Sequence, residues 1–159
     1  MIDGVKIKEL KVHKDVFNEG EEIVKEPGIL MEVLRSDEGL LEKFGQTIFT
    51  IAHKGTVKAF HYHKKQDDHW FFATGKAVVV LHDLRECSKT YKETQVIEAG
   101  EGDYKLISIP VGVAHGYKVI SDEPVLLFYH TTEVYNKENP DEERMAYNDK
   151  SINFNWDKY

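Results

Sequence analysis

Short β-rich runs separated by turn-forming residues recur along the middle of this chain, and they limit the folds open to it. Turn signals such as His53-Lys54-Gly55 and Thr74-Gly75-Lys76 divide the runs. Many short strands at this spacing are typical of an all-β sandwich or barrel. We expect strands at residues 46–52, 57–62, 70–73, 77–81, 104–109 and 125–131.

Residues 36–44 are the one segment with a helical pattern. Ser36 can cap a helix N-terminus, Leu40 and Leu41 form an apolar side, and Gly45 can end the helix. Residues 133–149 are polar and rich in turn formers, so we expect irregular chain laid over the barrel. The sequence thus predicts an all-β fold with one short helix.

The length of 159 residues suits one hydrophobic core, so we expect a single domain over residues 1–159. The formal net charge of −7 argues against a general nucleic-acid groove, which needs many cationic side chains. Neither a signal peptide nor a membrane span is evident, so we expect a cytoplasmic protein that engages no membrane. The single cysteine, Cys87, excludes an intrachain disulfide and is interpreted as structural.

Histidines are placed in an informative pattern. His61 and His63 stand two apart in an expected strand, so both side chains should leave the same face and converge. Together with Gly55, Asp68 and Gly75 they form a spacing that resembles the first cupin motif, with Asp68 where that motif usually carries Glu. The resemblance implies a double-stranded β-helix, or jelly-roll, barrel.

A second histidine segment, residues 110–115 (PVGVAH), resembles the core of the second cupin motif and ends on His115. Three imidazoles and one carboxylate suit Fe, Mn, Ni, Cu or Zn, because these ions accept neutral nitrogen together with one anionic oxygen. His61, His63, Asp68 and His115 are therefore candidate ligands of a divalent transition metal. The alternative is that His61 and His63 are half-buried strand residues hydrogen-bonded to their neighbours.

The stretch from Gly28 to Trp156 has a closer resemblance, to the dTDP-4-dehydrorhamnose 3,5-epimerase family of cupins. It rests on co-linear segments at residues 28–35 (GILMEVLR), 54–62 (KGTVKAFHY), 83–85 (DLR) with Ser88, 109–117 (IPVGVAHGY), and 147–149 (YND) with Trp156. The resemblance implies a homodimer that acts on a nucleotide-linked 4-keto-6-deoxy sugar and needs no cofactor.

Epimerisation beside a ketone needs a base, a group that stabilises the enolate oxygen, and an acid that returns the proton to the opposite face. The resemblance places His61 at the family's base position and Tyr129 at its acid position. His115 falls on the second site histidine. Gln46 and Lys58 fall on positions that hold the nucleotide, although Lys58 replaces an arginine and loses its bidentate fork.

The sequence also departs from the family pattern. Asp68 is at the position where the family's enolate-stabilising Lys is expected, and His63 replaces a Gln. Pro27 replaces an Arg and Ile48 an Asn, and no counterpart of the family's base-orienting Asp precedes Tyr159. The changes at His63 and Asp68 would convert a metal-free site into a metal site.

Three hypotheses follow: a sugar-nucleotide epimerase or isomerase, a metal-dependent cupin acting as isomerase or oxygenase, and a non-catalytic binding cupin. As a metal ligand through its one available lone pair, His61 could not also be the base. We interpret residues 70–72 as core and barrel wall, residues 133–143 as solvated surface, and His53 and His82 as lying outside the site.

Overall fold

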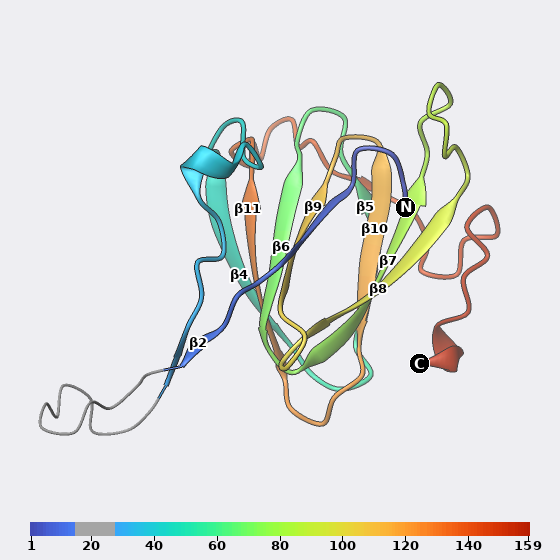
Figure 1. The fold of residues 1–159 in the computed structure, drawn as a ribbon. Helices are drawn as coiled ribbons and strands as arrows, with labels where there is room; N and C mark the ends of the chain where they lie inside the picture. Colours follow the sequence, from blue (N-terminus) through green and yellow to red (C-terminus); the bar gives the residue numbers. More distant parts are fainter. Residues whose placement is uncertain (15–27) are drawn as a thin grey trace, which may run out of the picture.

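The structure is a computed structural model that describes residues 1–14 and 28–159. Within these residues two five-stranded antiparallel sheets face each other and form a jelly-roll barrel (Figure 1). The first sheet has the order β1 (Lys6–Glu9), β9 (Lys105–Ile109), β6 (Asp68–Thr74), β11 (Val125–Thr131) and β4 (Gln46–Ala52). The second has the order β12 (Glu143–Arg144), β5 (Val57–Tyr62), β10 (Val113–Val119), β7 (Lys76–Asp83) and β8 (Thr94–Gly100). A short pair, β2 (His13–Lys14) with β3 (Ile29–Leu30), lies apart from the barrel.

The cupin-type all-β prediction is confirmed, and most of the strand boundaries agree with it. β4, β5 and β11 have the expected bounds, and β6, β7 and β9 agree to within two residues at each end. These runs were predictable because β-branched and aromatic residues end at clear turn formers. Residues 133–149 are largely irregular as expected, except that β12 pairs there with the edge of β5.

The predicted helix over residues 36–44 is wrong in length and in type. The chain forms only a 3-10 turn, Ser36–Glu38, whose N-cap is Arg35 and not Ser36. Gly39 follows in the left-handed conformation with φ of 63° and ends the turn six residues before Gly45. A segment this short gains too few helical hydrogen bonds to offset nucleation.

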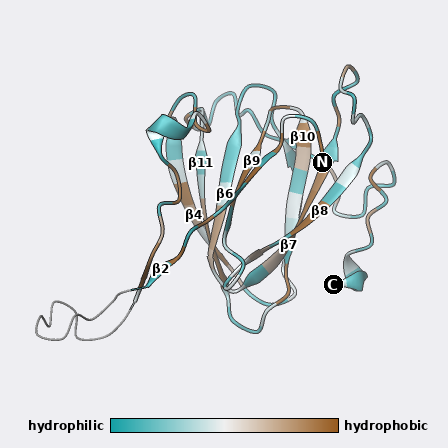
Figure 2. Ribbon diagram, viewed as in Figure 1, coloured by the Kyte–Doolittle hydropathy of each residue, from teal (hydrophilic) through white to brown (hydrophobic). Residues whose placement is uncertain are grey.

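The main core lies between the two sheets, and a second core lies outside the second sheet. Figure 2 shows hydrophobic stretches on strands of both sheets, whereas the loops are largely hydrophilic. In β7, Ala77, Val79 and Leu81 join the core between the sheets, whereas Val78 and Val80 join the outer one. The continuous apolar run in β7 therefore reflects burial on both of its faces.

The C-terminal segment covers that outer face and fixes the far end of the chain. The Trp156 ring packs on Phe60 of β5 at 5.5 Å between centroids, and its indole Nε1 donates to the Tyr147 carbonyl at 2.8 Å. Phe60, Tyr147 and Trp156 all belong to segments that resemble the epimerase family. Their contacts show that these segments pack against one another in the fold. Among the described residues, no helix is long and apolar enough to cross a membrane.

Candidate active site

A cavity of about 680 Å³ lies between the two sheets, and both sheets contribute side chains to its wall. All seven site residues expected from the sequence line it, namely Gln46, Lys58, His61, His63, Asp68, His115 and Tyr129. The volume falls in the range of about 300–1,000 Å³ that is usual for small-molecule sites. The fold thus gathers into one pocket residues that span most of the sequence.

The second sheet supplies His61 and Lys58 from β5. His115 lies opposite His61 across β10 and β5, and Tyr117 lies opposite Lys58, so the register shifts by one residue between the two pairs. This bulge brings Lys58 and His61, three apart in sequence, onto the cavity face. Gly116 permits it, because a Cβ there would lie 2.3 Å from the Cβ of Ala59.

The first sheet supplies the opposite wall. Tyr129 of β11 is paired with Trp70 of β6 and with Ile48 of β4, and all three line the cavity. Trp70 is buried with its ring edge-on to His115 at 5.0 Å between centroids, while Phe71 packs on the outside of the sheet. The interpretation of residues 70–72 as core and barrel wall agrees with this alternation.

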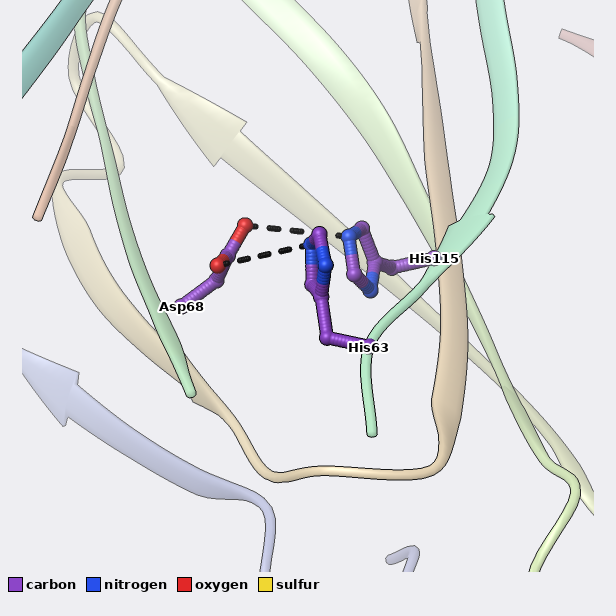
Figure 3. A group of neighbouring side chains, drawn as sticks. All are labelled: His63, Asp68 and His115. Atoms are coloured by element: carbon purple, nitrogen blue, oxygen red, sulfur yellow. Dashed lines mark ion pairs between the residues drawn. The ribbon is translucent and has the colours of Figure 1, made fainter. Parts of the chain in front are cut away.

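Three of the four candidate metal ligands meet in one buried cluster. One ligand atom each from His63, Asp68 and His115 lies within 4.8 Å of the others (Figure 3). His63 Nε2 lies 3.7 Å from Asp68 Oδ1, and His115 Nε2 lies 3.7 Å from Asp68 Oδ2. The two imidazoles thus face the two oxygens of a single carboxylate.

Among the described residues, this cluster contains three of the four expected metal ligands, and His61 lies outside it. The prediction assumed that His61 and His63 belong to one strand, but β5 ends at Tyr62. His63 follows the strand end, where the loop sets its direction. Its side chain is nearly buried, whereas that of His61 is 38% exposed to the cavity and solvent.

Backbone carbonyls orient both histidines of the cluster. His63 Nδ1 donates to the Asp141 carbonyl, and His115 Nδ1 donates to the Val113 carbonyl at 3.0 Å. Because a carbonyl only accepts, Nδ1 carries the proton and Nε2 carries the lone pair in each neutral ring. Asp68 is held in turn by Gln66 Nε2 at 2.7 Å and Trp70 Nε1 at 3.0 Å.

Burial and charge act against each other in this cluster. Burial by itself raises the pKa of Asp68, but the proximity of His63 and His115 outweighs it and lowers the pKa to about 2. Burial lowers the pKa of His115 to about 4, although Asp68 acts against it. For His63, burial is outweighed by Asp68 and the Asp141 carbonyl, which raise the pKa. Asp68 is therefore an anion at neutral pH, and His115 is neutral.

His61 has a different carboxylate beside it. Its Nδ1 lies 3.8 Å from Glu142 Oε1, and Glu142 also accepts from Arg144 Nε at 2.7 Å. Burial lowers the pKa of His61, and the charge of Glu142 partly opposes this shift. The ring is therefore neutral near pH 7.

Sequence reasoning missed several residues of the cavity wall, among them Asp141 and Glu142, because residues 133–143 were expected to be solvated surface. Both line the cavity. The Asp141 carboxylate accepts from the backbone N–H groups of Lys64, Lys65 and Gln66 at 3.0, 2.8 and 3.0 Å. It thereby ties the C-terminal segment to the loop that carries His63. No local signal marks either residue, because their neighbours come from the far side of the sequence.

Lys58 and Gln46, two further residues expected at the site, form hydrogen bonds in the cavity wall. Lys58 Nζ donates to Thr50 Oγ1 at 2.9 Å, and the Gln46 side-chain oxygen accepts from the Tyr135 N–H at 3.2 Å. Burial raises the pKa of Tyr129, and Asp68 and Glu142 add to the effect. Neither His53 nor His82 is among the residues that line the cavity. Pro27, one of the departures from the family pattern, lies outside the described residues.

Comparisons with known proteins agree with the sequence resemblance. A family model described as dTDP-4-dehydrorhamnose 3,5-epimerase matches residues 2–159. The chain is 50% identical to the spore coat polysaccharide biosynthesis protein SpsL of Bacillus subtilis over 156 residues, which are 98% of this chain and 97% of that protein.

Solved structures agree with this result. The dTDP sugar isomerase of Desulfovibrio desulfuricans G20 superposes with a TM-score of 0.84 at 26% identity, covering 99% of this chain and 94% of that chain. The epimerase RmlC of Legionella pneumophila, in complex with dTDP-4-keto-L-rhamnose, has a TM-score of 0.80 at 25% identity over 98% and 79% of the two chains.

Proposed function

Because the chain belongs to the dTDP-4-dehydrorhamnose 3,5-epimerase family and is a sugar-nucleotide epimerase or isomerase, we propose that it inverts carbons beside the ketone of a nucleotide-linked 4-keto-6-deoxy sugar, with His61 as base and Tyr129 as acid. The positions of His61 and Tyr129 in the fold support this assignment. His61 lies on β5 of one sheet and Tyr129 on β11 of the other, and both face the same cavity. Inversion needs proton carriers on opposite faces of the sugar ring, and the two facing sheets provide them.

The protonation states of the two residues match these roles. His61 is neutral near pH 7 and accepts a proton from the ring carbon through Nε2, while the C–H electron pair moves onto the carbonyl oxygen as an enolate. Tyr129 keeps its phenolic proton because its pKa is raised, so it can donate that proton to the other face of the carbon. The new C–H bond forms as the enolate returns to the ketone.

Glu142 takes the place of the family's base-orienting aspartate in this proposal. Its carboxylate lies 3.8 Å from Nδ1, so its charge can stabilise the imidazolium that forms. Glu142 immediately precedes β12, and Arg144 of β12 is paired with His61 in the sheet register. Glu142 is therefore a positioning residue that acts through His61.

A nucleotide-linked sugar is supported by polar and cationic side chains that line the cavity. Lys58 and Gln46 line it where the resemblance expects nucleotide-binding groups, and Lys65 adds a second cation to the wall. Two ammonium groups suit a diphosphate, although neither provides the paired hydrogen bonds of an arginine. The Legionella relative at 25% identity was solved with a dTDP-linked keto sugar, which supports the same ligand class.

The homodimer expected from the resemblance belongs to the same proposal. Phe49 and Ile51 of the edge strand β4, together with Phe128 of β11, leave an apolar strip exposed on the outer face of the first sheet. The Phe49 and Phe128 rings lie 4.8 Å apart, so the strip is continuous. An exposed apolar edge strand is typical of an interface. Sedimentation equilibrium should give twice the chain mass of 18.4 kDa, and a monomer at micromolar concentration would contradict the dimer.

Isotope exchange tests the proposed chemistry. Incubated with dTDP-4-keto-6-deoxyglucose in heavy water, the protein should incorporate deuterium into the sugar ring, as measured by mass spectrometry. His61→Asn should lower the exchange rate by about 10²–10⁴-fold, the usual contribution of a general base. His53→Asn, in an exposed turn outside the cavity, is the matched control. Absence of exchange with every nucleotide-linked keto sugar tried would contradict the proposal.

A further inference from the structure

We propose that His63, Asp68 and His115 form a binding site for one divalent transition-metal ion, such as Zn²⁺ or Fe²⁺, beside the proton-transfer residues. The metal site itself stands on the geometry of the three side chains. Only its role in catalysis rests on the proposed epimerase function.

The three side chains that converge in this cluster all present electron pairs to one another. In their neutral forms the two rings present the Nε2 lone pairs to Asp68, because Nδ1 of each ring is committed to a backbone carbonyl. Asp68 presents two carboxylate oxygens. Three electron-pair donors that face one another form a set that favours a bound cation. The neighbouring donor that such a cation would replace is Gln66 Nε2, which lies 2.7 Å from Asp68 Oδ1 and 3.4 Å from His63 Nε2.

The distances fit a metal better than direct hydrogen bonds. Both nitrogen-to-oxygen separations are 3.7 Å, beyond the reach of a hydrogen bond. With metal–ligand bonds of about 2.1 Å, a tetrahedral site places neighbouring ligand atoms about 3.4 Å apart. Each of the two nitrogen–oxygen pairs is therefore close to the separation that ligands of one ion require.

The surroundings of the three ligands are those of a pre-organised metal site. Each imidazole is oriented through its second nitrogen, and Asp68 is oriented by Gln66 and Trp70. Asp68 is 2% exposed and His115 is 4% exposed, so water competes weakly for either one. Because all three residues also line the cavity, a fourth coordination position can face a bound ligand.

The separation of His61 from the cluster is what makes the metal site compatible with epimerase chemistry. His61 lies outside the group of three ligand atoms, so its Nε2 is available to accept a proton. Asp68 occupies the position where the family resemblance expects the enolate-stabilising lysine. A cation held there would supply the positive charge that this lysine provides elsewhere in the family.

Direct metal binding tests the site independently of turnover. Protein purified without an affinity tag should carry close to one equivalent of a transition metal by elemental analysis. After removal of the metal with EDTA, titration with Co²⁺ should produce visible d–d absorption that saturates at one equivalent, and Zn²⁺ should raise the melting temperature. Less than about a tenth of an equivalent, with no d–d absorption from folded protein, would overturn the site, because a site with these ligands should hold one ion.

Single substitutions assign the ligands. Asp68→Asn and His115→Asn, each checked for native circular dichroism, should weaken Co²⁺ binding by at least about 100-fold, more than the loss of an outer-shell partner causes. His61→Asn and the control His53→Asn should bind Co²⁺ like the wild type. Equal weakening by His61→Asn would overturn the three-residue assignment.

The two proposals fail in different ways. If Co²⁺ binds and no deuterium exchange occurs with any keto sugar, the epimerase proposal fails and the metal site stands. If exchange proceeds at the same rate in metal-free and metal-loaded wild type, the metal's catalytic role is overturned. A rate that falls with metal removal and returns on addition of Zn²⁺ or Fe²⁺ supports both proposals.

Discussion

His61 and His115 lie directly opposite each other on β5 and β10, yet only His115 belongs to the cluster around Asp68. His115 is buried and turns its Nε2 toward Asp68, whereas His61 is partly exposed and turns its Nδ1 toward Glu142. The two imidazoles therefore have different carboxylate partners. A base and a metal ligand can thus occupy neighbouring strands of the same pocket without competing for one lone pair.

Glu142→Gln removes the charge that faces His61. We expect the turnover number to fall by at least about tenfold with little change in KM, because the carboxylate acts on the base through its charge and not on the substrate. The acid limb of the pH profile should move to lower pH, since Glu142 acts to raise the pKa of His61. Glu142→Asp should restore part of the rate. Glu143→Gln is the matched control, because Glu143 pairs with Lys64 at the surface, and an equal loss in that variant would contradict the role of Glu142.

Tyr129→Phe removes the proposed acid and leaves His61 in place. Deuterium should still enter the ring by reversible transfer through His61, whereas the inverted product should form at least about 10²-fold more slowly. Proton NMR of the sugar separates the two outcomes. Formation of the inverted product at the wild-type rate would exclude Tyr129 as the acid.

Asp141→Asn weakens the tie between the C-terminal segment and the loop carrying His63. Its carboxylate accepts three backbone N–H groups, and its carbonyl receives His63 Nδ1. We expect Co²⁺ affinity to fall by about 10–100-fold, as is usual when an outer-shell partner of a metal ligand is lost. Asp122→Asn, which breaks only a surface ion pair with Lys54, should leave Co²⁺ affinity unchanged.

The double variant His63→Gln with Asp68→Lys restores the residues that the family resemblance expects. It should lose Co²⁺ binding, because two of the three ligands are gone. Its deuterium exchange should become insensitive to EDTA, since the lysine provides the positive charge beside the enolate. Exchange that is still abolished by EDTA in this variant would contradict the equivalence of metal and lysine.

Asp83→Asn tests a buried carboxylate remote from the site. Burial raises its pKa, but hydrogen bonds from Arg85, Ser88 and Thr90 outweigh it and hold the pKa below the ordinary 3.8. A depressed pKa means that this residue stabilises the fold above pH 3.8 and that the contribution is lost as pH falls through the lower, folded-state value. We expect Asp83→Asn to reduce the free energy of unfolding by about 2 kcal/mol at neutral pH, and to flatten the loss of stability below pH 3.8. Urea melts across this pH range measure both effects.

The sequence by itself determined the barrel and identified seven of the residues that line the pocket. Strand periodicity located β4, β5 and β11 to the residue, because runs of β-branched and aromatic residues favour strands. The family resemblance placed His61, His115 and Tyr129 together, because a shared jelly-roll topology fixes which strand positions face the interior.

Only the tertiary structure decided that His63 and His115 face Asp68. It also decided that His61 faces Glu142 instead. The spacing of His61 and His63 predicted convergence on one point, but β5 ends at Tyr62 and the direction of His63 depends on a loop held by Asp141. Asp141 and Glu142 carry no local signal, since their partners lie about 75 or more residues away in sequence. Contacts of that separation arise from how β12 packs along the edge of β5, and no pattern of neighbouring residues encodes them.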